Sequence, residues 1–161
     1  MKTEVMFSKA SDEWETPQAF FDVLNLEFHF DVDAAATESN SKCGEAWFGL
    51  DDDAMCQDAL LITHWGLPFN PFVVWLNPPY SKCREFIAKA AEEAGKGCTV
   101  VCLVPSRTDT RWWHDYVWDR ETHQPRPGVE VRFVKGRLKF GGSVAGAPFP
   151  SVLVIFRPQE A

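Results

Sequence analysis

Residues 73–81 read Val73-Val74-Trp75-Leu76-Asn77-Pro78-Pro79-Tyr80-Ser81, a short apolar run followed by an abrupt polar turn. The first four residues are β-branched, aromatic or aliphatic, which is typical of a strand buried on both faces of a sheet. The two prolines fix two φ angles and carry no amide proton, so neither a strand nor a helix continues through them. The stretch therefore predicts a buried strand that ends in a rigid turn.

Further helices and strands are predicted on either side of this stretch. Apolar spacing predicts a helix that begins at Thr16-Pro17, with threonine as the cap and proline in the first helical position, and ends near Phe28. The alternating run from Phe28 to Val32 predicts a strand that ends at Asp33, and residues 34–72 are expected to be irregular. Beyond residue 81 we expect helices over 82–94 and 110–118, and strands over 99–104, 129–134 and 152–156.

The order of these elements predicts the fold class. Strands that alternate with helices imply a three-layer α/β fold with a mostly parallel sheet, and the last two strands, which lack a helix between them, favour an antiparallel hairpin at one edge. Ligands of such sheets bind outside the carboxyl ends of the strands. Asp33, Asn77 and Pro105 stand at predicted strand ends, so we expect all three on one rim.

Length and composition fit one soluble domain. The chain has 161 residues, 45% of them hydrophobic, and contains no repeat or Gly/Ser linker. We expect a single domain over residues 1–161, with residues 1–11 as a flexible tail. No apolar run approaches the roughly 20 residues of a membrane span, and the N-terminus lacks the apolar stretch of a signal peptide. These features predict a cytoplasmic protein with no membrane partner.

Charge is distributed unevenly along the chain, whose net charge is −7. Residues 1–80 contain 3 Lys and Arg against 14 Asp and Glu, whereas residues 81–161 contain 13 against 9. A polyanion would be attracted to the second half and repelled by the first, so the sequence permits DNA as a partner.

No metal site is expected. The five cysteines form no C-x-x-C pair, and Cys98 and Cys102 lie in or beside an apolar run, as ordinary core residues do. The acidic run 51–53 lacks the spaced ligands of a calcium loop, so a solvated turn explains it better.

The polar turn after the buried strand suits an aromatic amine. Asn77 offers a carbonyl oxygen, Pro78 a rigid backbone carbonyl and Tyr80 a flat ring. Two acceptors that hold both hydrogens of the amine would favour the pyramidal nitrogen that attacks a methyl group, and a stacked ring would hold the base. The alternative is a purely structural turn in which Tyr80 covers the core.

The turn resembles the D/N/S-P-P-Y/F signature of amino-methyltransferases, which act on adenine N6, cytosine N4 or glutamine amides. Its surroundings are similar to the phage-type DNA N6-adenine methyltransferases from about residue 12 to 157. The segments that carry this resemblance are Trp14-Glu15-Thr16-Pro17, Asp31-Val32-Asp33-Ala34-Ala35-Ala36 with Asn40 and Cys43, Asp58-Ala59-Leu60 with Trp65, Val104-Pro105-Ser106-Arg107-Thr108-Asp109-Thr110, Lys135-Gly136-Arg137-Leu138-Lys139-Phe140 and Ala147-Pro148-Phe149-Pro150-Ser151.

The resemblance implies a Rossmann-like methyltransferase fold and an enzyme that transfers a methyl group from S-adenosylmethionine to the N6 amine of adenine in DNA, in line and without a covalent intermediate or a metal. The target base would be flipped out of the duplex. The implied catalytic residues are Asn77, Pro78, Pro79 and Tyr80. The implied cofactor-binding residues are Trp14, Thr16, Pro17, Asp33, Ala34, Ala35, Asn40 and Asp58.

Several of these residues also have structural explanations. Thr16 and Pro17 suit a plain helix start, Asp33 suits an N-cap before an Ala-rich turn, and Asp58 suits a solvated loop. The Gly-rich loop that the broader methyltransferase pattern has near Asp33 is replaced by alanines.

DNA contacts are expected from the second half of the chain. Segments 106–128 and 141–150 are the candidates for base contacts, which predicts a short or relaxed target sequence. Trp112 and Trp113 suit either a wedge into DNA or, more simply, the core. The residues expected to contact DNA are Ser81, Lys82, Arg107, Thr108, Arg111, Lys135, Arg137 and Lys139.

Two alternatives remain open at this stage. One is a methyltransferase that acts on cytosine N4 or on a glutamine side chain of a protein. The other is a non-catalytic DNA-binding scaffold that keeps the fold. No obligatory protein partner is evident from the sequence.

Overall fold

The computed structural model describes residues 14–37, 39–44, 47–49, 59–67, 70–142 and 145–160. The predicted tail over residues 1–11, the acidic run 51–53 and the predicted cofactor residue Asp58 lie outside the described residues.

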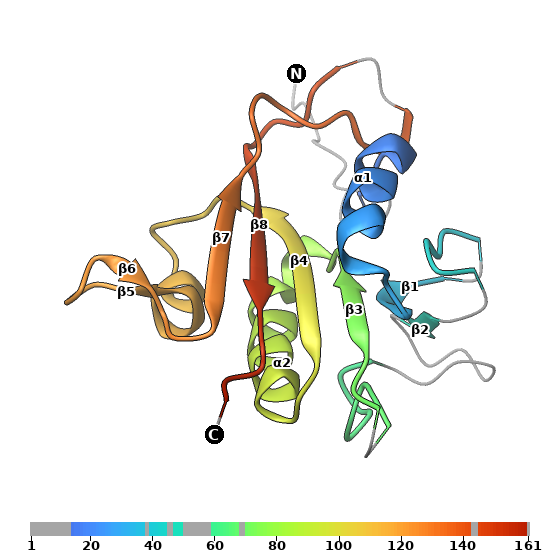
Figure 1. Ribbon diagram of the computed structural model, residues 1–161. Helices are drawn as coiled ribbons and strands as arrows, with labels where there is room; N and C mark the ends of the chain where they lie inside the picture. The colour runs from blue at the N-terminus through green and yellow to red at the C-terminus, as the bar shows by residue number, and fades with distance from the viewer. Residues whose placement is uncertain are drawn as a thin grey trace.

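A six-stranded sheet in the order β2-β1-β3-β4-β8-β7 forms the centre of the described part of the chain (Figure 1). Strands β2, β1, β3 and β4 pair in parallel, and β8 pairs antiparallel with both β4 and β7. The mixed α/β class, the mostly parallel sheet and the antiparallel pair at one edge are thereby confirmed. The strands are β1 (Val32–Ala36), β2 (Trp47–Gly49), β3 (Val73–Leu76), β4 (Thr99–Pro105), β7 (Val129–Phe133) and β8 (Ser151–Phe156).

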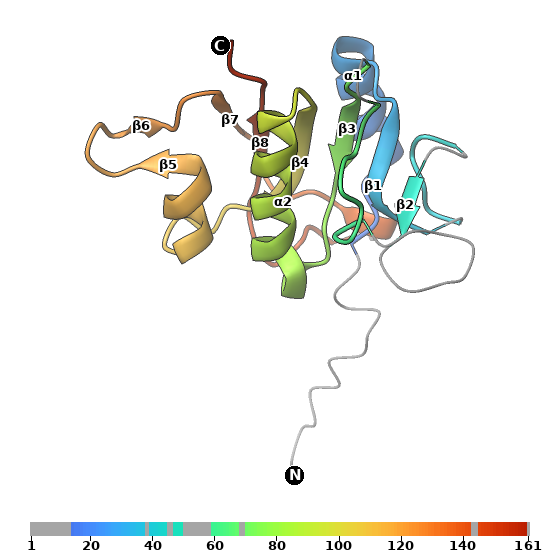
Figure 2. The same ribbon diagram turned by 90° about the horizontal axis from the view of Figure 1, so that it is seen from below.

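Helices cover both faces of this sheet (Figure 2). Helix α1 (Gln18–Phe28) buries Phe21, Leu24 and Phe28 in a cluster with Trp75 of β3. Helix α2 (Cys83–Gly95) packs against the other face. Its buried apolar side chains recur every three or four residues, which places them on one side of the helix: Cys83, Phe86, Ile87, Ala90 and Ala94.

The beginning of α1 differs from the prediction. Pro17 is the N-cap, the helix begins at Gln18, and no side chain caps it. The carbonyl of Pro17 instead accepts hydrogen bonds from the amides of Phe20 and Phe21, both at 3.1 Å. The assignment of Thr16 as the cap was therefore wrong.

The predicted strand from Phe28 to Asp33 was also wrong in its position. Phe28 is the last residue of α1, and His29 ends the helix in a left-handed conformation (φ 54°). The alternating rings pack as an aromatic cluster, with Phe28 stacked on Phe30 at 5.7 Å. Strand β1 begins at Val32 and includes the three alanines, so Asp33 lies inside the strand rather than at its carboxyl end.

The segment after β4 is helical close to the predicted range 110–118, but most of it is not a regular α-helix. A short helical turn passes into a π-helical turn, Trp113–Val117, and then into a small ribbon of β5 (Trp118–Asp119) and β6 (Gln124–Pro125). Trp112 and Trp113 are both buried in the core beside α2. Core packing thus explains both indoles better than a DNA wedge does.

Residues 34–72, predicted to be irregular, contribute part of β1 and the edge strand β2. None of the described helices is long and apolar enough to cross a membrane.

Candidate functional site

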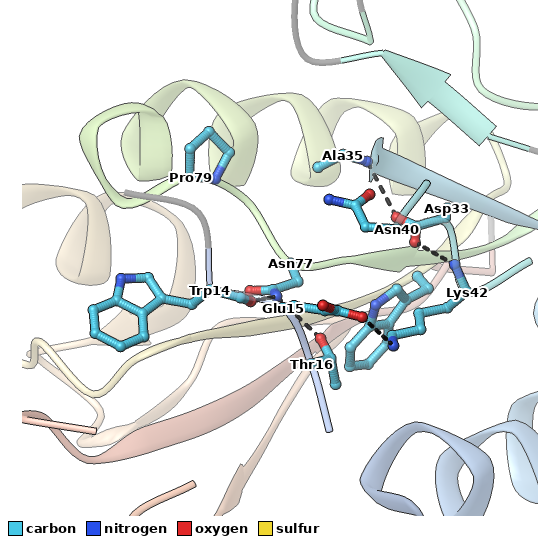
Figure 3. Close-up of a pocket in the computed structure, with 10 residues that line it drawn as sticks. Trp14, Glu15, Thr16, Asp33, Ala35, Asn40, Lys42, Asn77 and Pro79 are labelled. Atoms are coloured by element: carbon cyan, nitrogen blue, oxygen red, sulfur yellow. Dashed lines mark hydrogen bonds and ion pairs between the residues drawn. The ribbon is translucent and has the colours of Figure 1, made fainter. Parts of the chain in front are cut away.

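A small hollow lies beside the carboxyl end of β3, between β1 and the segment that leads into α1 (Figure 3). It encloses about 30 Å³, room for a water molecule or two, so lining side chains must move before a purine can enter. Seven of the predicted catalytic and cofactor residues line it: Trp14, Thr16, Asp33, Ala35, Asn40, Asn77 and Pro79. The fold therefore brings together residues from positions 14 to 79.

Asn77 is anchored by the segment before α1, residues 14–17, which we call the strap. Its side-chain Nδ2 donates to the backbone carbonyl of Trp14 and, at 3.0 Å, to the hydroxyl oxygen of Thr16. A backbone carbonyl can only accept, so the nitrogen end of the amide must face the strap. Within the described residues no hydrogen bond reaches Oδ1 of Asn77.

Asp33 is a buried carboxylate with no cationic partner within the described residues. Its Oδ1 accepts a hydrogen bond from the Ala35 amide at 3.3 Å, and its Oδ2 accepts one from the Lys42 amide at 3.0 Å. Burial raises the pKa of the Asp33 carboxyl from 3.8 to about 6, although the two amides offset part of the increase. A ligand that carries a positive charge would stabilise the ionised form.

Sequence reasoning assigned no role to three further lining residues, Glu15, Lys42 and Trp75. The Lys42 ammonium lies 3.4 Å from Glu15 Oε1 and 3.1 Å from Gln18 Oε1, which joins the turn after β1 to the strap and α1. Nothing local in the sequence indicates this contact, because it depends on how the two segments fold together.

Tyr80 belongs to a cluster of four aromatic rings from distant parts of the chain, with Trp14, Phe140 and Phe149. The Trp14 indole stacks on the Tyr80 ring at 5.9 Å with an interplanar angle of 20°, and Phe149 contacts it edge-on at 4.7 Å. Trp14 also contacts the edge of Phe140 at 5.7 Å. The indole therefore takes part of the space that we predicted for a stacked base.

The other predicted cofactor and catalytic residues have varied surroundings. Asn40 Oδ1 accepts from the Thr37 amide at 2.7 Å, which stabilises the turn after β1. Ala34 is fully buried and Pro78 is buried. Pro17 forms the start of α1. The described residues that line the hollow do not include Pro17, Ala34, Pro78 or Tyr80.

The predicted DNA-binding residues are accessible. All are exposed except Lys82, which is half-buried. Arg107, Thr108 and Arg111 follow β4, and Lys135, Arg137 and Lys139 follow β7. Because both strands run in the direction of β3, these residues follow the same edge of the sheet as Asn77. The segment after β7 also reaches the strap, since the Gly141 amide donates to the Glu15 carbonyl at 2.9 Å.

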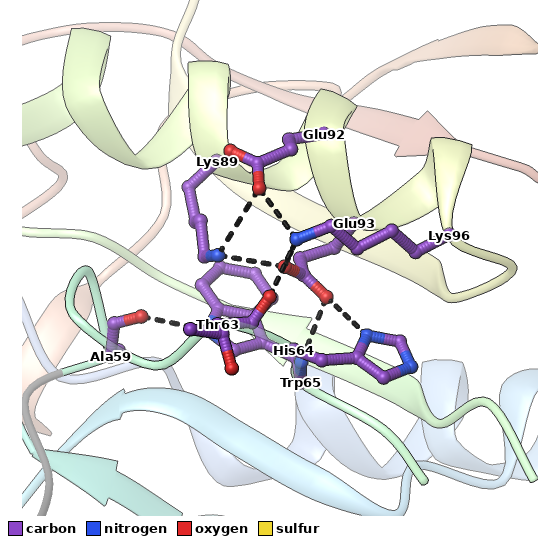
Figure 4. A network of polar contacts seen from close by, with 8 residues as sticks. All are labelled: Ala59, Thr63, His64, Trp65, Lys89, Glu92, Glu93 and Lys96. Atoms are coloured by element: carbon purple, nitrogen blue, oxygen red, sulfur yellow. Dashed lines mark hydrogen bonds and ion pairs between the residues drawn. The ribbon is translucent and has the colours of Figure 1, made fainter. Parts of the chain in front are cut away.

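A second polar cluster joins His64, Glu93 and Cys98, whose potential ligand atoms lie within 4.8 Å of one another. Figure 4 shows His64 and Glu93 with the other residues that contact Glu93. Both oxygens of Glu93 are already used, one by Lys89 and Lys96 and the other by His64 Nδ1 and the Trp65 amide. Two adjacent ammonium groups and a protonated thiol, whose pKa burial raises, do not suit a metal ion. The hydrogen bonds of this cluster instead hold residues 59–65 against α2.

The fold and the hollow define an α/β protein with a candidate ligand site at the carboxyl edge of a mostly parallel sheet. More specifically, the chain belongs to the family described as DNA N-6-adenine-methyltransferase (Dam), whose model matches residues 4–161. This match confirms the resemblance found in the sequence.

A curated relative, a DNA N-6-adenine-methyltransferase of Escherichia phage T1, is 31% identical over 103 residues. The matched region covers 63% of this chain but only 39% of that relative's length. No solved structure matches the chain.

Proposed function

We propose that this chain transfers a methyl group from S-adenosylmethionine to the exocyclic N6 amine of an adenine flipped out of DNA. Family membership supports the reaction class. The observation that carries the proposal is the orientation of Asn77, whose nitrogen faces the strap while Oδ1 has no partner among the described residues. An acceptor fixed in this way suits an amine that must be held by its hydrogens.

Asn77 and Pro78 act directly on the acceptor nitrogen in this proposal. The lone pair of an aromatic amine is delocalised into its ring, so the amine is a weak nucleophile. Hydrogen bonds from its two N–H groups to Asn77 Oδ1 and the Pro78 carbonyl favour the pyramidal form, and one of these protons later leaves to solvent. The prolines keep the two acceptors rigid, because they fix the backbone of the turn.

The residues near β1 fit the methionine part of the cofactor. Asp33 is a buried carboxylate without a cationic partner among the described residues, and Ala35, which lines the same hollow, has only a methyl side chain. Asp33 would hold the ammonium group, with Asn40 nearby; the roles of Pro17, Ala34 and Asp58 remain predictions from the family resemblance. When bound, S-adenosylmethionine supplies an electrophilic methyl group, and the C–S bond breaks with its electron pair left on sulfur as the N–C bond forms.

Base entry requires the aromatic cluster to open. Tyr80 can stack on the target adenine only if the Trp14 indole moves aside, since the two rings now stack on each other. We propose that exposed cations after β4 and β7 hold the phosphate backbone at the same edge, with Ser81 and Lys82 nearby. The whole chain would act as one Rossmann-like domain in the cytoplasm of a bacterial host, and segments 106–128 and 141–150 would read a short or relaxed target.

The test is methylation of defined DNA with labelled cofactor, followed by digestion and nucleoside analysis. We expect label in N6-methyl-2′-deoxyadenosine. Label in N4-methyl-2′-deoxycytidine would identify cytosine as the acceptor, and label in a protein glutamine but not in DNA would identify a protein acceptor. Calorimetry with S-adenosylmethionine provides the second arm. DNA binding with no cofactor binding would identify a non-catalytic scaffold.

A further inference from the structure

We propose that Thr16 is a positioning residue for the methyl transfer, because its hydroxyl holds the Asn77 amide in the orientation that the Trp14 carbonyl selects, with Oδ1 facing the acceptor amine. The inference rests on the proposed function, in which Asn77 Oδ1 receives a hydrogen of that amine. The family resemblance implies that Thr16 contacts the cofactor. The structure gives its hydroxyl a different partner, the Nδ2 atom of Asn77 at 3.0 Å.

The usual structural role of a threonine before a helix does not explain this hydroxyl. Helix α1 begins at Gln18, its N-cap is Pro17, and no side-chain cap is present. Thr16 is nevertheless only 3% exposed. A buried hydroxyl needs a polar partner, and Asn77 is the partner that the fold provides.

The strap holds Thr16 firmly enough to act on Asn77. Pro17 restricts Thr16 to an extended backbone and begins α1 with its own carbonyl. On the other side of Thr16, the Glu15 carbonyl accepts a hydrogen bond from the Gly141 amide at 2.9 Å. The hydroxyl is thus fixed between two anchored residues.

Orientation matters for asparagine because its two ends have opposite hydrogen-bonding character. If the amide were reversed, Nδ2 would face the acceptor amine with N–H donors, and the acceptor that pyramidalises the nitrogen would be lost. The Trp14 carbonyl can only accept and so excludes the reversed form, while the Thr16 hydroxyl accepts from the same nitrogen and holds the amide in place. Loss of Thr16 leaves one hydrogen without its partner.

The experiment compares Thr16→Val, which removes the hydroxyl at similar volume, with Thr16→Ser, which keeps it. We expect Thr16→Val to lower kcat for DNA methylation about tenfold, while the calorimetric Kd for S-adenosylmethionine changes less than about twofold. Thr16→Ser should recover most of kcat. A raised Kd with an unchanged kcat would overturn the proposal in favour of a cofactor contact.

A double-mutant cycle tests whether Thr16 acts through Asn77. In the Asn77→Ala background, Thr16→Val should have almost no further effect on kcat; an equal tenfold loss in both backgrounds would show that the two residues act independently. NMR provides a readout that does not depend on activity. The Asn77 side-chain NH₂ signals, assigned by their loss in Asn77→Ala, should shift and exchange faster with solvent in Thr16→Val.

Unchanged NH₂ signals would refute the hydrogen bond itself, whatever the enzyme methylates. If the wild-type chain methylated no DNA, the proposed function would be refuted. The NMR signals would still show whether Thr16 and Asn77 form the hydrogen bond.

Discussion

The Asp33 carboxylate accepts a hydrogen bond from the backbone amide of Lys42, whereas the Lys42 ammonium is directed at Glu15 and Gln18. Lys42 therefore binds the buried carboxylate through its backbone amide and contacts the strap and α1 through its charged side chain. Asp33 keeps a negative charge that no cation neutralises within the described residues, and its pKa is about 6 because of burial.

Cofactor affinity should depend on pH through Asp33. The raised pKa means that the carboxyl becomes protonated as the pH falls through about 6, and a neutral carboxyl cannot pair with the cofactor's ammonium group. We expect the affinity for S-adenosylmethionine, measured by calorimetry, to be roughly constant above pH 7 and to fall about tenfold between pH 7 and pH 5. Asp33→Asn is the control, with weak binding that varies little over this range. A flat wild-type profile would contradict the role of Asp33.

Asn77→Asp should impair the enzyme even though aspartate occurs at this place in the related D-P-P-Y signature. The oxygen that replaces Nδ2 would face the Trp14 carbonyl, and two acceptors would meet where a hydrogen bond now forms. We expect kcat to fall at least about tenfold, against at least about a hundredfold for Asn77→Ala, with cofactor affinity retained in both variants. Steady-state kinetics with labelled cofactor measures both effects. Wild-type turnover in Asn77→Asp would show that the strap does not constrain the side chain.

Glu93 should be important for stability rather than for activity. Burial alone would raise its pKa, but hydrogen bonds from Lys89, the Trp65 amide, His64 and Lys96 outweigh burial and lower the pKa to about 2. Glu93→Gln removes the closer and fully buried carboxylate partner of the buried Lys89, at 2.7 Å, and leaves it only the exposed Glu92 at 3.7 Å. We therefore expect the free energy of unfolding to drop by about 3 kcal/mol at pH 7 in urea denaturation.

Glu92→Gln is the matched control for Glu93→Gln. Glu92 is the preceding residue and pairs with the same two lysines, but its side chain is 57% exposed, so a loss below about 1 kcal/mol is expected. The pH dependence offers a further check. The folded-state pKa of Glu93 is depressed, so its contribution is present above about pH 4.5 and is lost as the pH falls toward 2. Equal losses in the two variants would mean that burial of Glu93 is unimportant.

Arg107 should contribute to DNA affinity through charge. It is exposed just after β4, at the edge where Asn77 follows β3. Arg107→Ala should weaken DNA binding and reduce the slope of log K against log salt concentration by about 1, as measured by fluorescence anisotropy. Arg157→Ala is the control, because β8 runs antiparallel to β4 and ends at the opposite edge. An identical salt slope in wild type and Arg107→Ala would exclude a phosphate contact.

Local patterns in the sequence were sufficient for the parts of the fold that depend on neighbouring residues. The strand Val73–Leu76 was predicted with its observed bounds, because apolar β-branched residues and two prolines define both its burial and its end. Helix α2 begins and ends within one residue of the prediction, since its apolar positions repeat at helical spacing. The alternation from Phe28 to Val32 led to a wrong strand prediction, because the rings of Phe28 and Phe30 pack in an aromatic cluster and do not belong to a strand.

The sequence by itself determined the α/β class, the family resemblance and the importance of the turn at Asn77. Only the tertiary structure decided how the site is assembled. The pairing of Asn77 with Thr16 joins residues 61 positions apart, and the contact between Lys42 and Glu15 joins a turn to the strap. Spacing along the chain carries no information about such partners, because hydrogen bonds between distant segments form only after the sheet has brought those segments together.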